Sequence, residues 1–426
     1  MKKELKYFFI FMGISLAYNI FAEDSTQVIY GPLPEPELIG LDSVSSLSIQ
    51  KAKNSDTSII LSHNSVDPTK SVEEKNQKAL DNEKRSLAGR FEFNFDSLNK
   101  ITTVSLFYTG IAFGDVDNDK KTETVLITPK NIHVFRYEGE QVTTLKRILD
   151  LKRKYLVSVD IADINGNGYE EIFIVSLDPF KTYLYTFVYE WNGEDFILIT
   201  KKIPYVTRVV RDKENNKVLM GQRSKKGVIF RGDIYSLKYD NSKYIQDEQI
   251  TRSCGINVLG MAYGSIVKRN SNSIAAYKSD DEINIFTSSR KAFAQHGERT
   301  GGSPEYIRYQ DGQTDANKVY LPARIVTTRD DMNNTQLFII KNYDITKDLL
   351  ANFRKYKNHH IESLHWNDMG LETIQKTKKL PGFIRDFGIA DFNNDGKVEL
   401  VASVISRHGK KFGKDNRCTL VYYNLK

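Results

Sequence analysis

The chain has 426 residues, of which 40% are apolar, and a formal net charge of +7. This length is enough for a large buried core, and a mild positive charge spread along the sequence argues against a nucleic-acid partner. The 23 Tyr and 23 Phe, with few long Ala/Leu/Glu/Lys stretches, favour an all-β fold over a helical one.

The first 22 residues have the features of a secretory signal peptide. Lys2, Lys3 and Lys6 form a positive start, residues 7–18 form a short apolar run, and Ala22 offers a small residue for cleavage. The run is short for a membrane span. We therefore expect residues 1–22 to be removed and the mature protein, with no integral membrane segment, to be exported to the periplasm, the cell surface or the medium. An uncleaved anchor is the alternative, because Ile20 stands where cleavage sites usually have a small residue.

Residues 23–89 predict a flexible segment. They begin with a proline-rich stretch at 31–36 and continue with Ser, Asp, Asn and Lys, and few apolar residues recur at strand or helix spacing. A short helix over residues 72–87 is the alternative, because its Glu and Lys side chains can pair along one face. In either case we expect residues 90–426 to form the folded domain.

Three stretches of that domain share one acidic pattern between two strand-like apolar runs. We call them loop 1 (residues 115–123), loop 2 (residues 163–171) and loop 3 (residues 391–399), and we number positions from the first Asp of each. Side-chain oxygens recur at positions 1, 3, 5 and 9, which is the hard-ligand set that Ca²⁺ prefers. The predicted metal ligands are Asp115, Asp117, Asp119 and Glu123 in loop 1, Asp163, Asn165, Asn167 and Glu171 in loop 2, and Asp391, Asn393, Asp395 and Glu399 in loop 3.

These loops differ from an EF-hand, which begins in the same way. An EF-hand needs a Glu at position 12 and a helix on each side, but position 12 is apolar in all three loops and the flanks are rich in β-branched and aromatic residues. We therefore expect each loop to join two adjacent strands. Gly168 and Gly396 at position 6 supply the backbone freedom of a tight loop, whereas loop 1 has Lys120 there, so its metal binding is left open.

The three strand-loop-strand units, residues 110–128, 158–176 and 387–404, resemble the FG-GAP or VCBS calcium-binding repeats of β-propellers, whose best-known member is the head of the integrin α subunit. This resemblance implies an all-β propeller that binds calcium in its loops and presents one face to a partner. A single loop of this kind is often only a polar turn held by its own side chains, so the expectation depends on the presence of three copies.

A second signature predicts the number of blades. Aromatic strands end in polar turns at residues 135–139, 189–193, 237–241 and 364–368, as hairpins between the outer strands of a blade would. The loop positions then fall near residues 115, 163, 212, 268, 330 and 391, at spacings that suit four-stranded blades. We predict six blades, with a seventh in residues 288–321 as the alternative. Residues 91–95 alternate as a strand does, and we expect them to close the ring by joining the last blade.

The loops near residues 212, 268 and 330 lack the later acid or all carboxylates, and we expect them to be turns without metal. Calcium in the other three loops is expected to be structural, because it neutralises oxygens that would otherwise repel one another. Weak sites, with dissociation constants of about 10⁻⁴ to 10⁻³ M, are enough in exported compartments.

Two function classes fit these features. The leading interpretation is an exported, non-catalytic, monomeric calcium-binding propeller that binds a protein or a glycan. The alternative is an exported hydrolase or lyase with a site at the central channel, where loops of several blades meet. No Gly-x-Ser-x-Gly elbow, His-Glu-x-x-His motif or phosphate-binding glycine loop supports the enzyme. The discriminating feature is a cluster of carboxylates, His or Arg at the mouth of the channel.

Some remaining residues allow both a functional and a structural interpretation. Cys254 and Cys418 fall in different repeats, so a buried free thiol is favoured over a disulfide between them. Trp191 and Trp366 occupy matching places in the repeat, which favours blade packing over a glycan platform. The basic stretch 407–414 is typical of a solvated hairpin, with an acidic polymer or lipid head group as the alternative partner.

Overall fold

The computed structural model describes residues 60–61, 99–104 and 107–424, except for short gaps at 140, 149–150, 152–153, 179, 181–182, 227, 252–254, 269–270, 279–280, 288–291, 296–298, 301, 310–316, 330–334, 346–353 and 408–415. The predicted signal peptide, most of the predicted flexible segment, Cys254 and most of the basic stretch 407–414 lie outside the described residues. Within the described part of the chain, no helix has the length and apolar character needed to cross a membrane.

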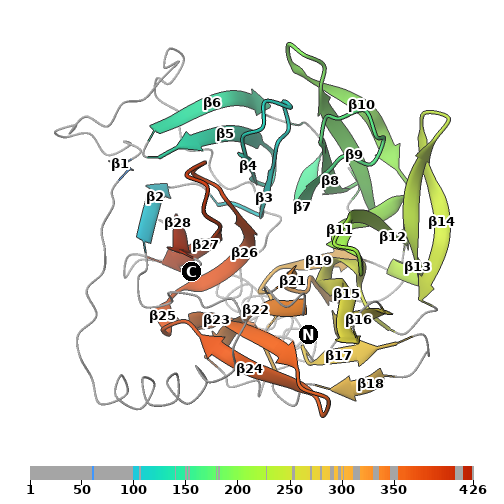
Figure 1. The fold of residues 1–426 in the computed structure, drawn as a ribbon, viewed down its shortest axis with the longest axis vertical. Helices are drawn as coiled ribbons and strands as arrows, with labels where there is room; N and C mark the ends of the chain where they lie inside the picture. The colour runs from blue at the N-terminus through green and yellow to red at the C-terminus, as the bar shows by residue number, and fades with distance from the viewer. Residues whose placement is uncertain are drawn as a thin grey trace, which may run out of the picture. The chain divides into compact units, whose positions relative to one another are not determined.

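The described chain is almost entirely β and forms six four-stranded antiparallel sheets, the blades of a β-propeller (Figure 1). Blade 1 consists of β3 (Gly110–Gly114), β4 (Glu123–Ile127), β5 (Ile132–Glu138) and β6 (Gln141–Ile148). Blade 2 consists of β7 (Tyr155–Ala162), β8 (Glu171–Leu177), β9 (Leu184–Trp191) and β10 (Phe196–Ile203). Blade 3 consists of β11 (Tyr205–Arg211), β12 (Lys217–Lys225), β13 (Val228–Asp240) and β14 (Lys243–Thr251). A 3-10 turn, η1 (Val258–Gly260), leads into the fourth blade.

The other three blades have the same strand order. Blade 4 consists of β15 (Met261–Lys268), β16 (Ser271–Tyr277), β17 (Ile283–Phe286) and β18 (Ala292–Gln295). Blade 5 consists of β21 (Val326–Arg329), β22 (Thr335–Asp344), β23 (Tyr356–Trp366) and β24 (Leu371–Lys376), and β25 (Leu380–Pro381) also pairs with β23. Blade 6 consists of β26 (Phe383–Ala390), β27 (Glu399–Arg407), β28 (Asn416–Asn424) and β2 (Asn99–Val104), and β1 (Ile60–Leu61) pairs with β2.

The first strand of each blade is its innermost strand. The inner strand β3 contacts both β7 of blade 2 and β26 of blade 6, so the ring closes between blades 6 and 1. An N-terminal strand completes the last blade, as predicted, because β2 pairs with β28 (Thr102 opposite Leu420). The closing strand is nevertheless residues 99–104; residues 91–95 lie outside the described residues. Pairing strands from the two parts of the chain covers a sheet edge that would otherwise be open.

The blade count is six. The alternative of a seventh blade in residues 288–321 is wrong for the residues described there, which form the fourth strand of blade 4 and a two-stranded hairpin of β19 (Tyr306–Tyr309) and β20 (Asn317–Tyr320). The predicted loop positions fall between the first and second strands of all six blades, and the predicted aromatic turns fall between the third and fourth strands of blades 1, 2, 3 and 5.

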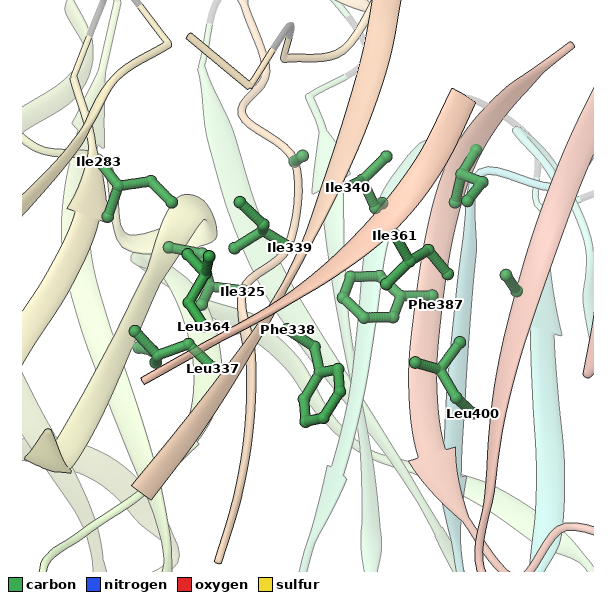
Figure 2. Close-up of a cluster of buried hydrophobic side chains, with 14 of the residues drawn as sticks. Ile283, Ile325, Leu337, Phe338, Ile339, Ile340, Ile361, Leu364, Phe387 and Leu400 are labelled. Atoms are coloured by element: carbon green, nitrogen blue, oxygen red, sulfur yellow. The ribbon is translucent and has the colours of Figure 1, made fainter. Parts of the chain in front are cut away.

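The core lies between neighbouring blades. On β22, four consecutive apolar residues (337–340) are fully buried, because one blade covers each face of the strand (Figure 2). A continuous apolar run of this kind is what a strand buried on both faces requires. Separate clusters join blades 1 and 2, blades 6 and 1, and blades 2 and 3.

The structural interpretation of the tryptophans and of Cys418 is confirmed. Trp191 packs against Phe196, with ring centroids 4.9 Å apart, and Trp366 packs against the cluster of blades 4 to 6. Cys418 is a buried free thiol, and burial raises its pKa to about 12. It therefore forms no disulfide and is unreactive at neutral pH.

Candidate functional site: three acidic loops

Loops 1, 2 and 3 follow the inner strands of blades 1, 2 and 6, which are consecutive in the ring. Direct hydrogen bonds link them. In loop 3, Asn394 accepts the N–H of Thr122 at 2.7 Å and donates to the carbonyl of Tyr137 at 2.7 Å. Between loops 1 and 2, Glu170 accepts the N–H of Asp115 at 2.9 Å. The three loops therefore form one continuous row at the same end of the inner strands.

The three loops share one backbone conformation. Positions 4 and 6 have a positive φ in every loop: 59° and 70° at Asn118 and Lys120, 75° and 91° at Gly166 and Gly168, and 58° and 83° at Asn394 and Gly396. Glycine and asparagine enter this left-handed region most easily. Lys120 adopts it without that advantage, so the departure noted in the sequence of loop 1 does not change its path.

The same side-chain hydrogen bonds fix each loop. The carboxylate at position 1 accepts the N–H of position 6 at 2.8, 3.0 and 3.0 Å in loops 1, 2 and 3. The oxygen at position 5 accepts the N–H of position 7 at 3.0, 2.9 and 2.9 Å. The glutamate at position 9 accepts the N–H of position 2 at 3.0, 2.6 and 3.3 Å. The predicted ligand residues at positions 1, 5 and 9 thus have the same backbone partners in three equivalent loops.

The glutamates at position 9 are buried carboxyl groups. Their exposed fractions are 0%, 0% and 1%, and burial raises the pKa of Glu123 and Glu171 to about 7 and that of Glu399 to about 8. Burial raises these values because it removes the water that stabilises the carboxylate. A bound cation would stabilise the same charge, so a divalent ion suits these positions.

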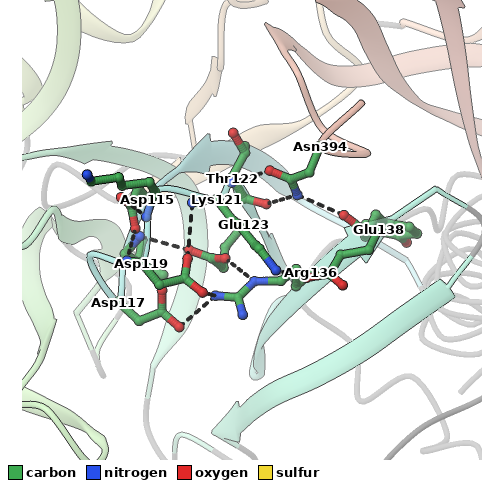
Figure 3. Close-up of polar contacts among 12 residues, drawn as sticks. Asp115, Asp117, Asp119, Lys121, Thr122, Glu123, Arg136, Glu138 and Asn394 are labelled. Atoms are coloured by element: carbon green, nitrogen blue, oxygen red, sulfur yellow. Dashed lines mark hydrogen bonds and ion pairs between the residues drawn. The ribbon is translucent and has the colours of Figure 1, made fainter. Parts of the chain in front are cut away.

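A side-chain cation from the neighbouring strand already lies against loop 1. Arg136 on β5 lies across the strand pair from Glu123, and its guanidinium binds Glu123 at 2.8 Å, Asp117 at 2.7 Å and Asp119 at 2.9 Å (Figure 3). In the described part of the chain, Asp115, Asp117 and Glu123 form the only group of three acids whose oxygens lie within 4.8 Å of one another. The predicted ligand set whose oxygens lie closest together is therefore the one beside Arg136, which pairs with two of its three members.

Loop 2 contains a further acid at the equivalent place. Ile172 pairs with Tyr189, so the adjoining residues Glu171 and Glu190 face each other across β8 and β9. Glu190 accepts hydrogen bonds from the side-chain amides of Asn165 at 2.5 Å and Asn167 at 3.1 Å. Glu190 therefore lies beside positions 3 and 5 of loop 2, and the hydroxyl of Tyr244 donates to Glu171 at 2.7 Å.

Sequence reasoning missed Arg136 and Glu190, although a signal for both was present. Each lies between two aromatic residues in the repeated strands 135–137 and 189–191, at the same distance from its hairpin turn. In blade 6 the residue opposite Glu399 is the uncharged Asn424. The residue opposite the position-9 glutamate is thus a base in blade 1 (Arg136), an acid in blade 2 (Glu190) and an amide in blade 6 (Asn424).

The fit to a metal ion therefore differs among the loops. In the described residues, no lysine or arginine forms an ion pair with the predicted ligand positions of loops 2 and 3, although Lys217 pairs with the adjoining Glu170, so a divalent cation meets less competition there than in loop 1. The ligand oxygens of loop 1 are held by Arg136, and that donor set does not fit a metal in the same way.

The degenerate loop at residue 212 is a polar turn. Asp212 accepts the N–H groups of Glu214 at 2.9 Å and Asn216 at 2.8 Å, and Asn215 has a φ of 74°. Its side chain is thus occupied by local turn bonds. Residues 269–270 and 330–334 of the other two degenerate loops lie outside the described residues.

A second charged cluster fills the middle of the ring. Arg324, just before β21, binds Asp160 of β7 at 2.5 Å and Asp386 of β26 at 2.8 Å. Arg208 of β11 binds the same Asp160 at 3.2 Å. Burial opposes ionisation of Asp386, but the charge of Arg324 outweighs it and lowers the pKa. No sequence pattern indicated this cluster, because its members lie in four different blades.

The family model that matches the chain is described as an FG-GAP-like repeat and covers residues 115–174, from the start of loop 1 into β8. The chain is thus a six-bladed β-propeller that contains an FG-GAP-like repeat in residues 115–174, and the two findings together support an FG-GAP repeat propeller.

A comparison with curated proteins gave no match. Among solved structures, the chain is similar to BBS1N, crystallised in complex with ARL6DN and soaked with lead, with 9% identity, 76% of this chain and 95% of that chain covered, and a TM-score of 0.40. It is also similar to a putative oxidoreductase (glucose dehydrogenase) from Thermus thermophilus, with 10% identity, coverage of 74% and 96%, and a TM-score of 0.39. Likenesses at this level carry no argument about function.

Proposed function

We propose that this propeller is an exported, non-catalytic interaction module whose acidic loops bind Ca²⁺ and hold the face that meets a protein or glycan partner. The observation that carries the proposal is the row of loops 3, 1 and 2, which share one backbone path and one set of hydrogen bonds. Local bonds alone would hold three turns, but in the described residues the buried Glu171 and Glu399 form no ion pair with a lysine or arginine, and burial raises the pKa of both.

Export is proposed from the N-terminal sequence, with its lysines followed by a short apolar run. Calcium is abundant outside the cytosol, so weak sites suffice there. In this role the ion is structural: it fixes a row of loops that connects three neighbouring blades, and it keeps their outer surface in one conformation for a partner.

The charged cluster in the channel supports binding over catalysis. An enzyme needs acids or bases that remain available to a substrate. Asp160, Arg208 and Asp386 are instead buried, the side chain of Arg324 is only 11% exposed, and the four bind one another, which suits a structural role.

The test is thermal unfolding of a chain that begins at residue 23, in EDTA and in 1 to 5 mM CaCl₂. We expect Ca²⁺ to raise the melting temperature, because an ion that binds only the folded state stabilises it. The variant Glu399→Gln should lose part of this increase, whereas Glu194→Gln, at an exposed residue in the hairpin after β9, should retain it. An identical melting curve in EDTA and Ca²⁺ would contradict calcium binding. A partner from the native envelope that is retained only with Ca²⁺ would support the interaction role.

A further inference from the structure

The oxygens that Arg136 binds are the ones that loop 1 leaves available to an ion. Both oxygens of Asp115 accept backbone N–H groups, at 3.0 and 2.8 Å. Asp119 and Glu123 each use one oxygen for the backbone and the other for Arg136. Only Oδ1 of Asp117 is buried without a hydrogen-bond partner in this loop. Backbone N–H groups bind the equivalent oxygens in loops 2 and 3 as well, so the feature that distinguishes loop 1 is the guanidinium on the carboxylates of positions 3, 5 and 9.

The guanidinium of Arg136 also contacts three side chains of the loop at the same time. Nε binds position 9 and Nη2 binds positions 3 and 5, so one planar group reaches three carboxylates from the neighbouring strand. Its side chain is only 13% exposed. A partly buried guanidinium with several carboxylate partners is held firmly, since its fork of donors matches carboxylate geometry.

The net charge of each loop, counted with its cross-strand residue, also differs among the three loops, and it is least negative in loop 1. Residues 115–123 with Arg136 contain four acids and three bases, a net charge of −1. Residues 163–171 with Glu190 contain four acids, and Lys217, which pairs with Glu170, brings their net charge to −3; residues 391–399 with Asn424 contain three acids and one base, a net charge of −2. Electrostatic demand for a divalent cation is therefore weakest in loop 1 and strongest in loop 2.

We propose that the guanidinium of Arg136 takes the place of the metal ion in loop 1, so that blade 1 is held by a side-chain cation and only loops 2 and 3 take calcium, with Glu190 adding a fifth oxygen-bearing side chain to loop 2. The assignment of calcium to loops 2 and 3 rests on the proposed function. The replacement by Arg136 rests on the contacts of loop 1 alone.

The experiment counts the Ca²⁺ ions bound per chain, by equilibrium dialysis and native mass spectrometry of chains that begin at residue 23. We expect two for the wild type and three for Arg136→Gln, because the neutral side chain releases three carboxylates. Arg136→Gln should also melt at a lower temperature than the wild type in EDTA and gain more from Ca²⁺. Arg136→Lys and Lys121→Gln are the controls: the first keeps the charge beside the loop, the second removes a base that pairs with the exposed Glu138, and both should stay at two. An Arg136→Gln chain that binds as many ions as the wild type, or fewer, overturns the proposal.

A second variant covers the case in which Arg136→Gln does not fold. Glu190→Arg places a guanidinium opposite Glu171, the arrangement that blade 1 has naturally. We expect this chain to fold in EDTA and to bind one ion fewer than the wild type; an unchanged count overturns the proposal. If the wild type binds no Ca²⁺, the proposed function fails, but the proposal for Arg136 is still decided by whether Arg136→Gln gains one ion.

Discussion

Arg324 and Asp160 form an ion pair between blades 5 and 2, which lie opposite each other in the six-bladed ring. The same guanidinium donates to the carbonyl of Val159 at 2.8 Å and binds Asp386 of blade 6 through two nitrogens, at 2.8 and 3.1 Å. One side chain thus connects the segment just before β21 to the inner strands β7 and β26 across the channel. Burial opposes ionisation of Arg324, but the charges of Asp160 and Asp386 outweigh it and raise its pKa.

Removing this arginine should destabilise the protein strongly. Arg324→Met keeps much of the side-chain length but leaves two buried carboxylates without their main partner, so we expect a loss of about 3–5 kcal/mol in the free energy of unfolding. Urea unfolding followed by fluorescence measures it. Lys238→Met is the control, because Lys238 and Asp247 form an exposed ion pair on blade 3 and no change is expected there. Equal midpoints for the two variants would contradict a structural role of the cluster.

The junction of blades 6 and 1 should depend on Asn394. Its side chain accepts the N–H of Thr122 and donates to the carbonyls of Thr122 and Tyr137. Asn394→Gly removes these bonds without adding backbone strain at a φ of 58°, and a loss of about 1–3 kcal/mol is expected. The matched variant Asn118→Gly changes the same position of loop 1, where the side chain is exposed, and should be near neutral. Similar losses in both variants would mean that the backbone of position 4, and not the bond between blades, is what matters.

The sequence predicts where each repeat lies because each acidic loop is held by hydrogen bonds between its own residues. The oxygens at positions 1 and 5 bind the backbone of their own loop, so the residue types follow directly from the turn. Blade number and the position of the predicted ligand residues in the blades could be derived from these turns and from the aromatic hairpins.

Contacts between residues far apart in the chain could not be predicted in this way. Arg324 and Asp160 are 164 residues apart, and the closing strand β2 pairs with β28 at the other end of the chain. Arg136 and Glu190 are intermediate cases. Each lies one hairpin away from its loop, but whether its side chain faces the loop depends on the strand register, which the sequence does not state.

Position 6 offers a comparison of one substitution in two equivalent loops. Gly396 has a φ of 83° and nothing within 4 Å of an added Cβ, so Gly396→Ala tests the backbone alone. We expect a loss of about 1–2 kcal/mol, the usual cost of a left-handed residue with a side chain. Lys120→Ala should change stability little, because Lys120 already has a Cβ at a φ of 70°. Chemical unfolding in EDTA measures both; a loss at Lys120 as large as that at Gly396 would contradict this explanation.

Glu362 on β23 should make stability depend on pH in acid. Burial opposes its ionisation, but the hydrogen bond and charge of His360 and the charge of Lys376 outweigh it and lower the pKa of Glu362 from its ordinary 4.5 to about 2. Because the folded-state value is the lower one, its contribution is complete above pH 4.5 and is lost as the pH falls through 2. Glu362→Gln should therefore cost about 1.5–3 kcal/mol at pH 7 and flatten the pH dependence between 4.5 and 2.

Unfolding midpoints at pH 7, 5, 4, 3 and 2 test this expectation. Glu372→Gln is the control, because Glu372 is an exposed glutamate on the neighbouring strand β24, opposite His365. Its profile should follow that of the wild type at every pH, while the profile of Glu362→Gln should approach both only near pH 2. If Glu362→Gln runs parallel to the wild type down to pH 2, the hydrogen bond from His360, at 2.5 Å, does not stabilise the carboxylate over the neutral form.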